Sequence, residues 1–349
     1  MPYVKRLPIM TDLKNYICIN PFVYTEITVD KQHMCCNEWM SLNIKTKGNL
    51  NDNWNSEKAI SARQSMLDGS FKYCSTNKCP HLNDVVHNDR PSGPVRFKTD
   101  DLVKDLTQHK LPNSMKVVFD SACNLACPSC RSDFIRNNDF ITNKSKSILK
   151  DVEKSYGESL EFISMSGYGD PFYSEALFEW LCNFDSTKYP NMKNIHLHTN
   201  GMLWNERNWN KIKLSQPFIK SAEISIDAAN ADTYHNVRKG GKWHLLLKNL
   251  EFINTLTQID TMIISFVIQN DNYKEIVAFY QLMDSIFKNK NNITFQYYKI
   301  LNWGSLSDEE FKDKAVWHTD HPNYNDLVGQ IKVLDSFNDS RVVHSLHGI

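Results

Sequence analysis

The sequence predicts an α/β fold with a parallel sheet, preceded by a small cysteine-rich α+β domain. From Met115 onward, short β-rich runs alternate with longer helical patterns. Six such strands joined by helical crossovers indicate a parallel sheet, in either a doubly wound or a partial-barrel arrangement. Residues 1–84, in contrast, contain short strands and turns with one helix. We therefore expect two domains, with residues 85–112 as a linker because this stretch has several prolines and charges and few apolar residues.

The expected elements of the N-terminal domain are short. Its strand candidates are 17–20, 24–29 and 32–36, and its helix candidate is 56–67. The second and third strands flank Asp30-Lys31, which predicts a hairpin.

The larger domain is expected at residues 113–304, followed by a C-terminal helical extension at 305–349. Its strand candidates are 115–119, 160–165, 194–198, 222–226, 262–268 and 293–298. Its helix candidates are 134–156, 174–184, 204–213, 231–256 and 273–287, with two more beginning near Ser307 and after Pro322. In both parallel architectures the active site lies at the carboxyl ends of the strands.

Charge and hydropathy exclude several classes of function. Lys+Arg 40 balance Asp+Glu 40, so no bulk field attracts the chain to nucleic acid or an anionic membrane. The chain shows no apolar run long enough for a membrane span, and its start lacks the apolar core of a signal peptide, so we expect a cytoplasmic protein. We find no phosphate loop, no nucleophilic triad and no general acid or base that the sequence singles out.

Cysteine usage is the most informative feature of the composition. The nine cysteines are odd in number, unevenly spaced and not preceded by an export signal, which favours metal ligation over disulfides. Cys182 lies in an apolar helical pattern and is expected to be a small hydrophobic core residue.

Three cysteines follow the first strand of the larger domain in one loop. Cys123, Cys127 and Cys130 have C-x3-C-x2-C spacing. Three thiolates on one tight loop can hold three irons of a cubane and leave the fourth iron open for chemistry. A structural zinc site normally has four ligands, and no nearby histidine completes this set. Three inert buried cysteines are the remaining alternative.

The N-terminal domain offers a second set of thiols. Cys18 precedes the hairpin, Cys35 and Cys36 close it, and Cys74 and Cys79 follow the helix. Four thiolates from a hairpin and a later turn can complete a four-iron cluster. A zinc site with four cysteine ligands stays open as the alternative, since spacing barely separates the two.

The three-cysteine loop after a strand resembles the signature of the radical S-adenosylmethionine (SAM) superfamily. The resemblance covers about residues 115–300 and implies a partial (β/α)6 TIM-like barrel, a SAM-binding [4Fe-4S] cluster on Cys123, Cys127 and Cys130, and SAM as cosubstrate. One departure is Ser129, where the family usually has an aromatic residue.

Three further strand ends resemble SAM-binding segments of that superfamily. The segment 166–171 is similar to its Gly-Gly-Glu-Pro motif, 198–201 to its Thr-Asn-Gly corner, and Ser225 to Asp227 with Arg238 to its carboxylate- and ribose-binding stretch. The cofactor-binding residues that the resemblance implies are Gly169, Asp170, Pro171, Asn200, Ser225, Asp227 and Arg238.

Residues 1–84 resemble the twitch or SPASM auxiliary-cluster modules of radical SAM enzymes. Here the module precedes the barrel, Lys31 replaces the usual turn glycine, and the later cysteine pair is spaced by four residues. Aligning the stretch from Cys18 favours Cys36 over Cys35. The implied cofactor is a second [4Fe-4S] cluster on Cys18, Cys36, Cys74 and Cys79, with zinc as the alternative.

The resemblance implies reductive cleavage of SAM and hydrogen abstraction from a substrate. We expect modification of a peptide or protein side chain, with the auxiliary cluster as electron acceptor or relay and a flavodoxin or ferredoxin as electron donor. Dehydrogenation or epimerisation of a sugar or other small metabolite is the alternative reaction. A metal-stabilised binding module without catalysis is the alternative of another class.

Overall fold

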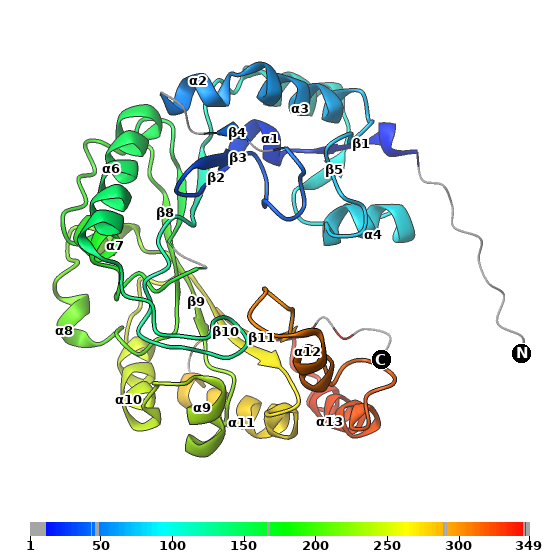
Figure 1. Ribbon diagram of the computed structural model, residues 1–349, viewed down its shortest axis with the longest axis vertical. Helices are drawn as coiled ribbons and strands as arrows, with labels where there is room; N and C mark the ends of the chain where they lie inside the picture. The colour runs from blue at the N-terminus through cyan, green and yellow to red at the C-terminus, as the bar shows by residue number, and fades with distance from the viewer. Residues whose placement is uncertain are drawn as a thin grey trace, which may run out of the picture. The chain divides into compact units, whose positions relative to one another are not determined.

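The computed structural model describes residues 12–42, 44–45, 49–165, 168–288, 290, 292–344 and 346 (Figure 1). The chain divides into two compact units. The first contains Met1–Phe119, Lys146–Ile163 and Ser186–Met192, and the second contains Asp120–Ser145, Ser164–Asp185 and Lys193–Ile349. This division differs from the predicted domain boundary, because two later segments of the chain join the first unit.

The sheet of the first unit is built around the predicted hairpin. Strand β2 (Tyr24–Ile27) pairs antiparallel with β3 (Lys31–His33) and parallel with β6 (Ser114–Val117), and β4 (Ile44–Lys45) pairs antiparallel with β3. The strand predicted at 32–36 ends early at His33. The backbone then forms a turn in which the Trp39 amide donates to the Cys36 carbonyl, so the cysteines lie beyond the hairpin.

The prediction of a linker at 85–112 is wrong. The segment contains the end of α4 (Pro80–Asn88), strand β5 (Val95–Phe97) and α5 (Asp100–Gln108). Strand β5 pairs antiparallel with β1 (Tyr16–Cys18), and its Val95 is buried. One or two buried apolar residues per element are enough here, which is why a count of apolar residues missed them. The other helices of this part are α1 (Asn20–Val23), α2 (Leu50–Trp54) and α3 (Glu57–Leu67).

The second unit confirms the predicted α/β fold with a mainly parallel sheet. Five strands pair in the order β12-β11-β10-β9-β8, and each neighbouring pair is parallel. Figure 1 labels four of them, β8 to β11. They are β8 (Asn194–Thr199), β9 (Ser221–Ser225), β10 (Thr261–Ile268), β11 (Ile293–Lys299) and β12 (Val342–His344), and β7 (Phe162–Met165) is the strand predicted at 160–165. The short strand β12 was not predicted.

Helices follow the strands as the sequence predicts. They are α6 (Asp139–Tyr156), α7 (Glu175–Cys182), α8 (Glu206–Trp209), α9 (Ala231–Val237), α10 (Trp243–Asn254), α11 (Ile276–Phe287), α12 (Asp308–Lys314) and α13 (Tyr324–Ser336). Short 3-10 turns occupy Leu13–Asn15, Gln216–Phe218 and Tyr273–Glu275. The helix predicted at 231–256 is two helices, because Gly240 between them has φ +92°. Within the described ranges, no helix has the length and apolar character needed to cross a membrane.

The strand ends of the second unit change abruptly from apolar to polar. Ile195 and Leu197 of β8 and Ile224 of β9 are fully buried and lie on the same face of the sheet. Thr199 and Ser225 then end the same two strands. Because the strands are parallel, their polar ends lie at one edge of the sheet.

Candidate functional site

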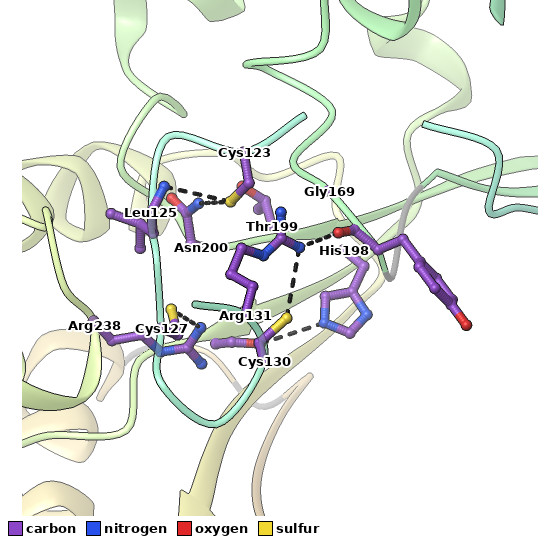
Figure 2. Close-up of a pocket in the computed structure, with 12 residues that line it drawn as sticks. Cys123, Leu125, Cys127, Cys130, Arg131, Gly169, His198, Thr199, Asn200 and Arg238 are labelled. Carbon is purple, nitrogen blue, oxygen red and sulfur yellow. Dashed lines mark hydrogen bonds between the residues drawn. The ribbon is translucent and has the colours of Figure 1, made fainter. Parts of the chain in front are cut away.

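A cavity of about 520 Å³, partly open to solvent, lies at the polar edge of the second unit. Its walls are formed by Cys123, Leu125, Cys127, Cys130, Arg131, Tyr168, Gly169, His198, Thr199, Asn200, Ser225 and Arg238 (Figure 2). The structure therefore brings the three predicted loop cysteines to one cavity, together with four of the seven predicted cofactor-binding residues.

The cysteine loop is held by backbone hydrogen bonds. The Cys123 amide donates to the Ile135 carbonyl at 2.9 Å, and the Ala126 amide donates to the Lys239 carbonyl at 3.0 Å. A tight turn follows, in which the Cys130 amide donates to the Cys127 carbonyl at 2.8 Å. These bonds fix the direction of the loop before any ligand binds.

Each thiol of the loop accepts a hydrogen bond from a different group (Figure 2). Cys123 Sγ accepts from the Leu125 amide at 3.5 Å and from Asn200 Nδ2 at 3.6 Å. Cys127 Sγ accepts from Arg238 Nη1 at 3.6 Å, and Cys130 Sγ accepts from Arg131 Nη2 at 3.5 Å. Donors of this kind stabilise a metal-bound thiolate and tune the metal that it holds.

The donor set fits an iron–sulfur cluster. Burial raises the pKa of the Cys123 thiol to about 11, so a thiolate there requires a strong positive partner such as a metal centre. The three thiols border one shared cavity, which suits a multi-iron cluster with ligands spread around it.

Asp170, predicted as a ligand of the cosubstrate amino group, does not line the cavity. Its side chain is fully buried. One carboxylate oxygen accepts from the Phe172 amide at 3.0 Å. The other accepts from Thr199 Oγ1 at 2.7 Å and from the Asn200 amide at 3.0 Å. Asp170 therefore holds the Thr199–Asn200 corner in place, and its contact with the cosubstrate amino group stays a prediction.

The other predicted cofactor-binding residues divide into those that line the cavity and those that do not. Gly169, Asn200, Ser225 and Arg238 line the cavity, whereas Pro171 and Asp227 do not. Asp227 is 1% exposed and lies 2.7 Å from Arg238 Nη2. Of the segment 166–171, residues 166 and 167 lie outside the described residues.

The sequence did not single out Arg131 or His198 for a role of its own at the site. Arg131 Nη1 donates to the Ser121 carbonyl at 2.7 Å, and Nη2 donates to the Tyr168 carbonyl. Arg131 thus connects the cysteine loop to the end of β7, and its place directly after Cys130 was the available signal. His198 Nε2 lies 3.3 Å from Ser225 Oγ in the cavity wall, as its position one residue before the end of β8 could have indicated.

A second cavity lies within the first unit. Four thiols line it: Cys18, Cys35, Cys74 and Cys79. The rest of its wall is mainly apolar and consists of Trp39, Met40, Phe71, Leu82, Pro94 and Val95. Cys36 does not line this cavity, so the structure favours the alternative Cys35 over the preferred Cys36. Cys35 and Cys36 are adjacent after the end of β3, and only Cys35 lines the cavity. An alignment of cysteine spacing does not distinguish two adjacent positions. Cys182 lines neither cavity.

Two of these thiols also accept hydrogen bonds. Cys35 Sγ accepts from Asn20 Nδ2 at 3.7 Å. Cys79 is the N-cap of α4, and its sulfur accepts from the Leu82 amide at 3.4 Å. Burial raises the pKa of Cys35 and of Cys74 to about 12, so a metal centre has to replace protons at this site as well.

Comparison with known proteins finds a curated relative and several solved structures, all at low sequence identity. No family model matches the chain. A GTP 3',8-cyclase from Alkaliphilus oremlandii (strain OhILAs) is 28% identical over 190 residues, covering 52% of this chain and 55% of that protein. This similarity supports the resemblance to the radical SAM superfamily. The chain spans about half the length of the curated relative it matches.

The solved structures that match the chain share less sequence identity with it. Native anSMEcpe with bound AdoMet is 18% identical with a TM-score of 0.44, over 67% of this chain and 64% of that one. TYW1 with a lysine-pyruvate adduct is 19% identical with a TM-score of 0.36, over 61% of this chain and 70% of that one.

Gly169 provides a first test of the site. A Cβ at this position would lie 2.5 Å from the Ala122 carbonyl oxygen and 2.9 Å from that of Asp120. Because both are backbone atoms of the cysteine loop, Gly169→Ala has to displace the loop. We expect at least about a tenfold loss of 5'-deoxyadenosine formation from SAM under reducing conditions, equivalent to about 1.4 kcal/mol.

The matched control is Gly329→Ala in α13, where a Cβ would meet nothing within 4 Å. It should keep the parent rate and iron content. A Gly169→Ala protein with the parent rate would show that the loop tolerates this displacement and that the close approach is not required.

Proposed function

We propose that this chain cleaves SAM reductively and removes a hydrogen atom from its substrate, using a [4Fe-4S] cluster held by Cys123, Cys127 and Cys130. The observation that carries this proposal is the shared cavity. The three thiols of the C-x3-C-x2-C loop face the same space as the strand-end residues Gly169, Asn200, Ser225 and Arg238.

A cluster with one open iron, if these cysteines hold it, would bind SAM and supply the electron that cleaves a carbon–sulfur bond of the SAM sulfonium. The chain's own residues orient the ligands and enclose the reaction. Asn200 and Arg238 direct the sulfurs of Cys123 and Cys127 through hydrogen bonds. Leu125 contributes an apolar wall, which helps to exclude water from a reactive intermediate.

The direct experiment measures iron and acid-labile sulfide per chain after anaerobic purification. The variant replaces Cys123, Cys127 and Cys130 with alanine. If both proposed clusters are present, iron should fall from about eight to about four per chain, and 5'-deoxyadenosine formation should be lost. Loss of nucleoside formation without loss of iron would contradict the ligand assignment.

We further propose that residues 1–84 form a twitch- or SPASM-like domain whose auxiliary [4Fe-4S] cluster accepts or relays electrons. Cys18, Cys35, Cys74 and Cys79 line one cavity, and this supports a four-thiolate site. A structural zinc would need all four sulfurs within about 2.3 Å of one point. Zinc held by the same four thiols is the alternative. Full cysteine ligation favours an electron role over substrate ligation.

The adjacent residues Cys35 and Cys36 form a matched pair for this second site. Cys35→Ala should lower iron by about four per chain because it removes one of the four thiols that line the cavity. Cys36→Ala should retain the parent iron content, since Cys36 lies outside that wall. The reverse result would restore Cys36 as the ligand, and zinc in place of the lost iron would make the site structural.

For the substrate, we propose a peptide or protein side chain. Exposed aromatic residues near the cysteine loop support this choice, since an extended chain needs apolar contacts outside the cavity. Tyr168 in the cavity wall is 47% exposed. Trp303 is 65% exposed, on a segment that Ser305 attaches to the cysteine loop by donating to the Pro128 carbonyl at 3.1 Å.

A small metabolite is the second candidate for the substrate. The similarity to a GTP 3',8-cyclase favours a nucleotide among small metabolites. A sugar that is oxidised or epimerised is the other candidate of this kind. In either case we propose a flavodoxin or ferredoxin as the electron donor.

Isotope transfer distinguishes the two substrate classes. The reduced protein is incubated with SAM and with either the protein fraction or the small-molecule fraction of cells grown on deuterated medium. Hydrogen abstraction should place deuterium in 5'-deoxyadenosine, and we expect it from the protein fraction. Transfer from the small-molecule fraction alone would overturn the peptide proposal, and deuterated GTP tests the nucleotide directly. The Cys123/Cys127/Cys130 triple alanine variant is the control that should transfer none.

A further inference from the structure

Arg238 and Asp227 form a buried ion pair beside Cys127. Arg238 Nη2 lies 2.7 Å from Asp227 Oδ2, and the two side chains are 12% and 2% exposed. Arg238 Nη1 donates to Cys127 Sγ at 3.6 Å. Each terminal nitrogen of the guanidinium therefore already has a partner within the protein.

The position of the pair is fixed from the Asp227 side. Asp227 Oδ1 accepts from the Val267 amide at 2.7 Å, and the Asp227 carbonyl accepts from Asn272 Nδ2 at 2.9 Å. Its backbone has φ +64°, in the left-handed region that few residues other than glycine and Asn or Asp adopt. The carboxylate cannot turn away from Arg238 without breaking these contacts.

Arg238 differs from the other donors to the loop sulfurs. Cys123 receives hydrogen bonds from neutral groups, the Leu125 amide and the Asn200 side chain. Arg131, which donates to Cys130, is also bound to backbone carbonyls. The Arg238 charge is buried against a sulfur and a carboxylate, where the surrounding medium screens it little.

We propose that Arg238 is a positioning residue that sets the reduction potential of the cluster at Cys127, with Asp227 as its opposing charge. The proposal rests on the cysteine ligands proposed above. One-electron reduction adds a negative charge to the cluster, so a buried cation beside a sulfur ligand favours the reduced form and a buried carboxylate disfavours it. This role replaces the cosubstrate carboxylate clamp predicted for Arg238.

The test is a redox titration of the anaerobically purified protein, followed by electron paramagnetic resonance. The cluster signal that changes on addition of SAM identifies the reactive cluster. Arg238→Met should lower its midpoint potential, because the carboxylate remains without its cation. Asp227→Asn should raise it, because the cation remains without its carboxylate. We expect each shift to correspond to at least about a tenfold change in the reduction equilibrium, or about 59 mV for one electron.

Arg341→Met is the matched control. Like Arg238, Arg341 is paired with carboxylate: its Nη2 lies 2.6 Å from Asp339 Oδ2 and 2.6 Å from Asp284 Oδ1. Arg341 does not line the cavity of the loop cysteines. Its loss should leave the midpoint potential unchanged. Arg341→Met therefore controls for the general loss of an arginine–carboxylate pair, and the opposite shifts expected at positions 238 and 227 separate an electrostatic effect from a local structural one.

Opposite shifts in the two variants support the proposal. Parent-like midpoints in both, with weaker SAM binding by Arg238→Met, would overturn it and return Arg238 to the role of a cosubstrate ligand. If Arg238→Met does not retain iron, Asp227→Asn and Arg238→Lys decide the question. An unchanged midpoint potential in Asp227→Asn overturns the proposal. A downward shift of about 59 mV in Arg238→Lys also overturns it, because lysine keeps the positive charge. A parent protein without a SAM-sensitive signal would instead refute the proposed function itself.

Discussion

The buried carboxylate of Asp170 is the constraint on which the candidate site depends. A charge without access to water requires several hydrogen-bond donors. Asp170 obtains them from Phe172, Thr199 and Asn200, so the ends of two strand segments must meet at one place. Asn200 then donates to Cys123 Sγ. A single buried acid thus determines where one of the three loop thiols lies, although it does not itself face the cavity.

Parallel strands explain how residues so distant in the sequence reach one cavity. Neighbouring strands that run in the same direction end at the same edge, and each end here contributes one or two polar side chains. The cysteine loop adds thiols at the same edge. Rigid strands below and a hydrogen-bonded loop above allow hydrogen bonds of fixed geometry to each sulfur, which a mobile loop alone would not provide.

Much of the fold and the cysteine set could be predicted from the sequence, because both depend on local patterns. Strand periodicity and C-x3-C-x2-C spacing are short-range signals. The roles of Asp170 and Asp227 could not be predicted, because a motif shows that an acid is present but not whether its carboxylate faces a ligand or a buried backbone amide. The same limit applies to Cys35 and Cys36, where one residue of register decides which thiol enters the cavity. The prediction of a linker at 85–112 was wrong for another reason. The elements of this segment are stabilised by tertiary pairing, such as that of β1 with β5, which local composition does not reveal.

The two cysteine cavities differ in the charges and polar groups around their sulfurs. The loop cysteines lie among Arg131, Arg238, Asn200 and His198, whereas the four thiols of the first unit are enclosed mainly by aromatic and aliphatic side chains. Cations and amide donors stabilise a reduced, more negative cluster, and an apolar wall disfavours it. The polar cavity is therefore suited to a cluster that must take up an electron and bind a charged cosubstrate. The apolar cavity is suited to a fully ligated centre that is kept from solvent and exchanges electrons without binding a molecule of its own.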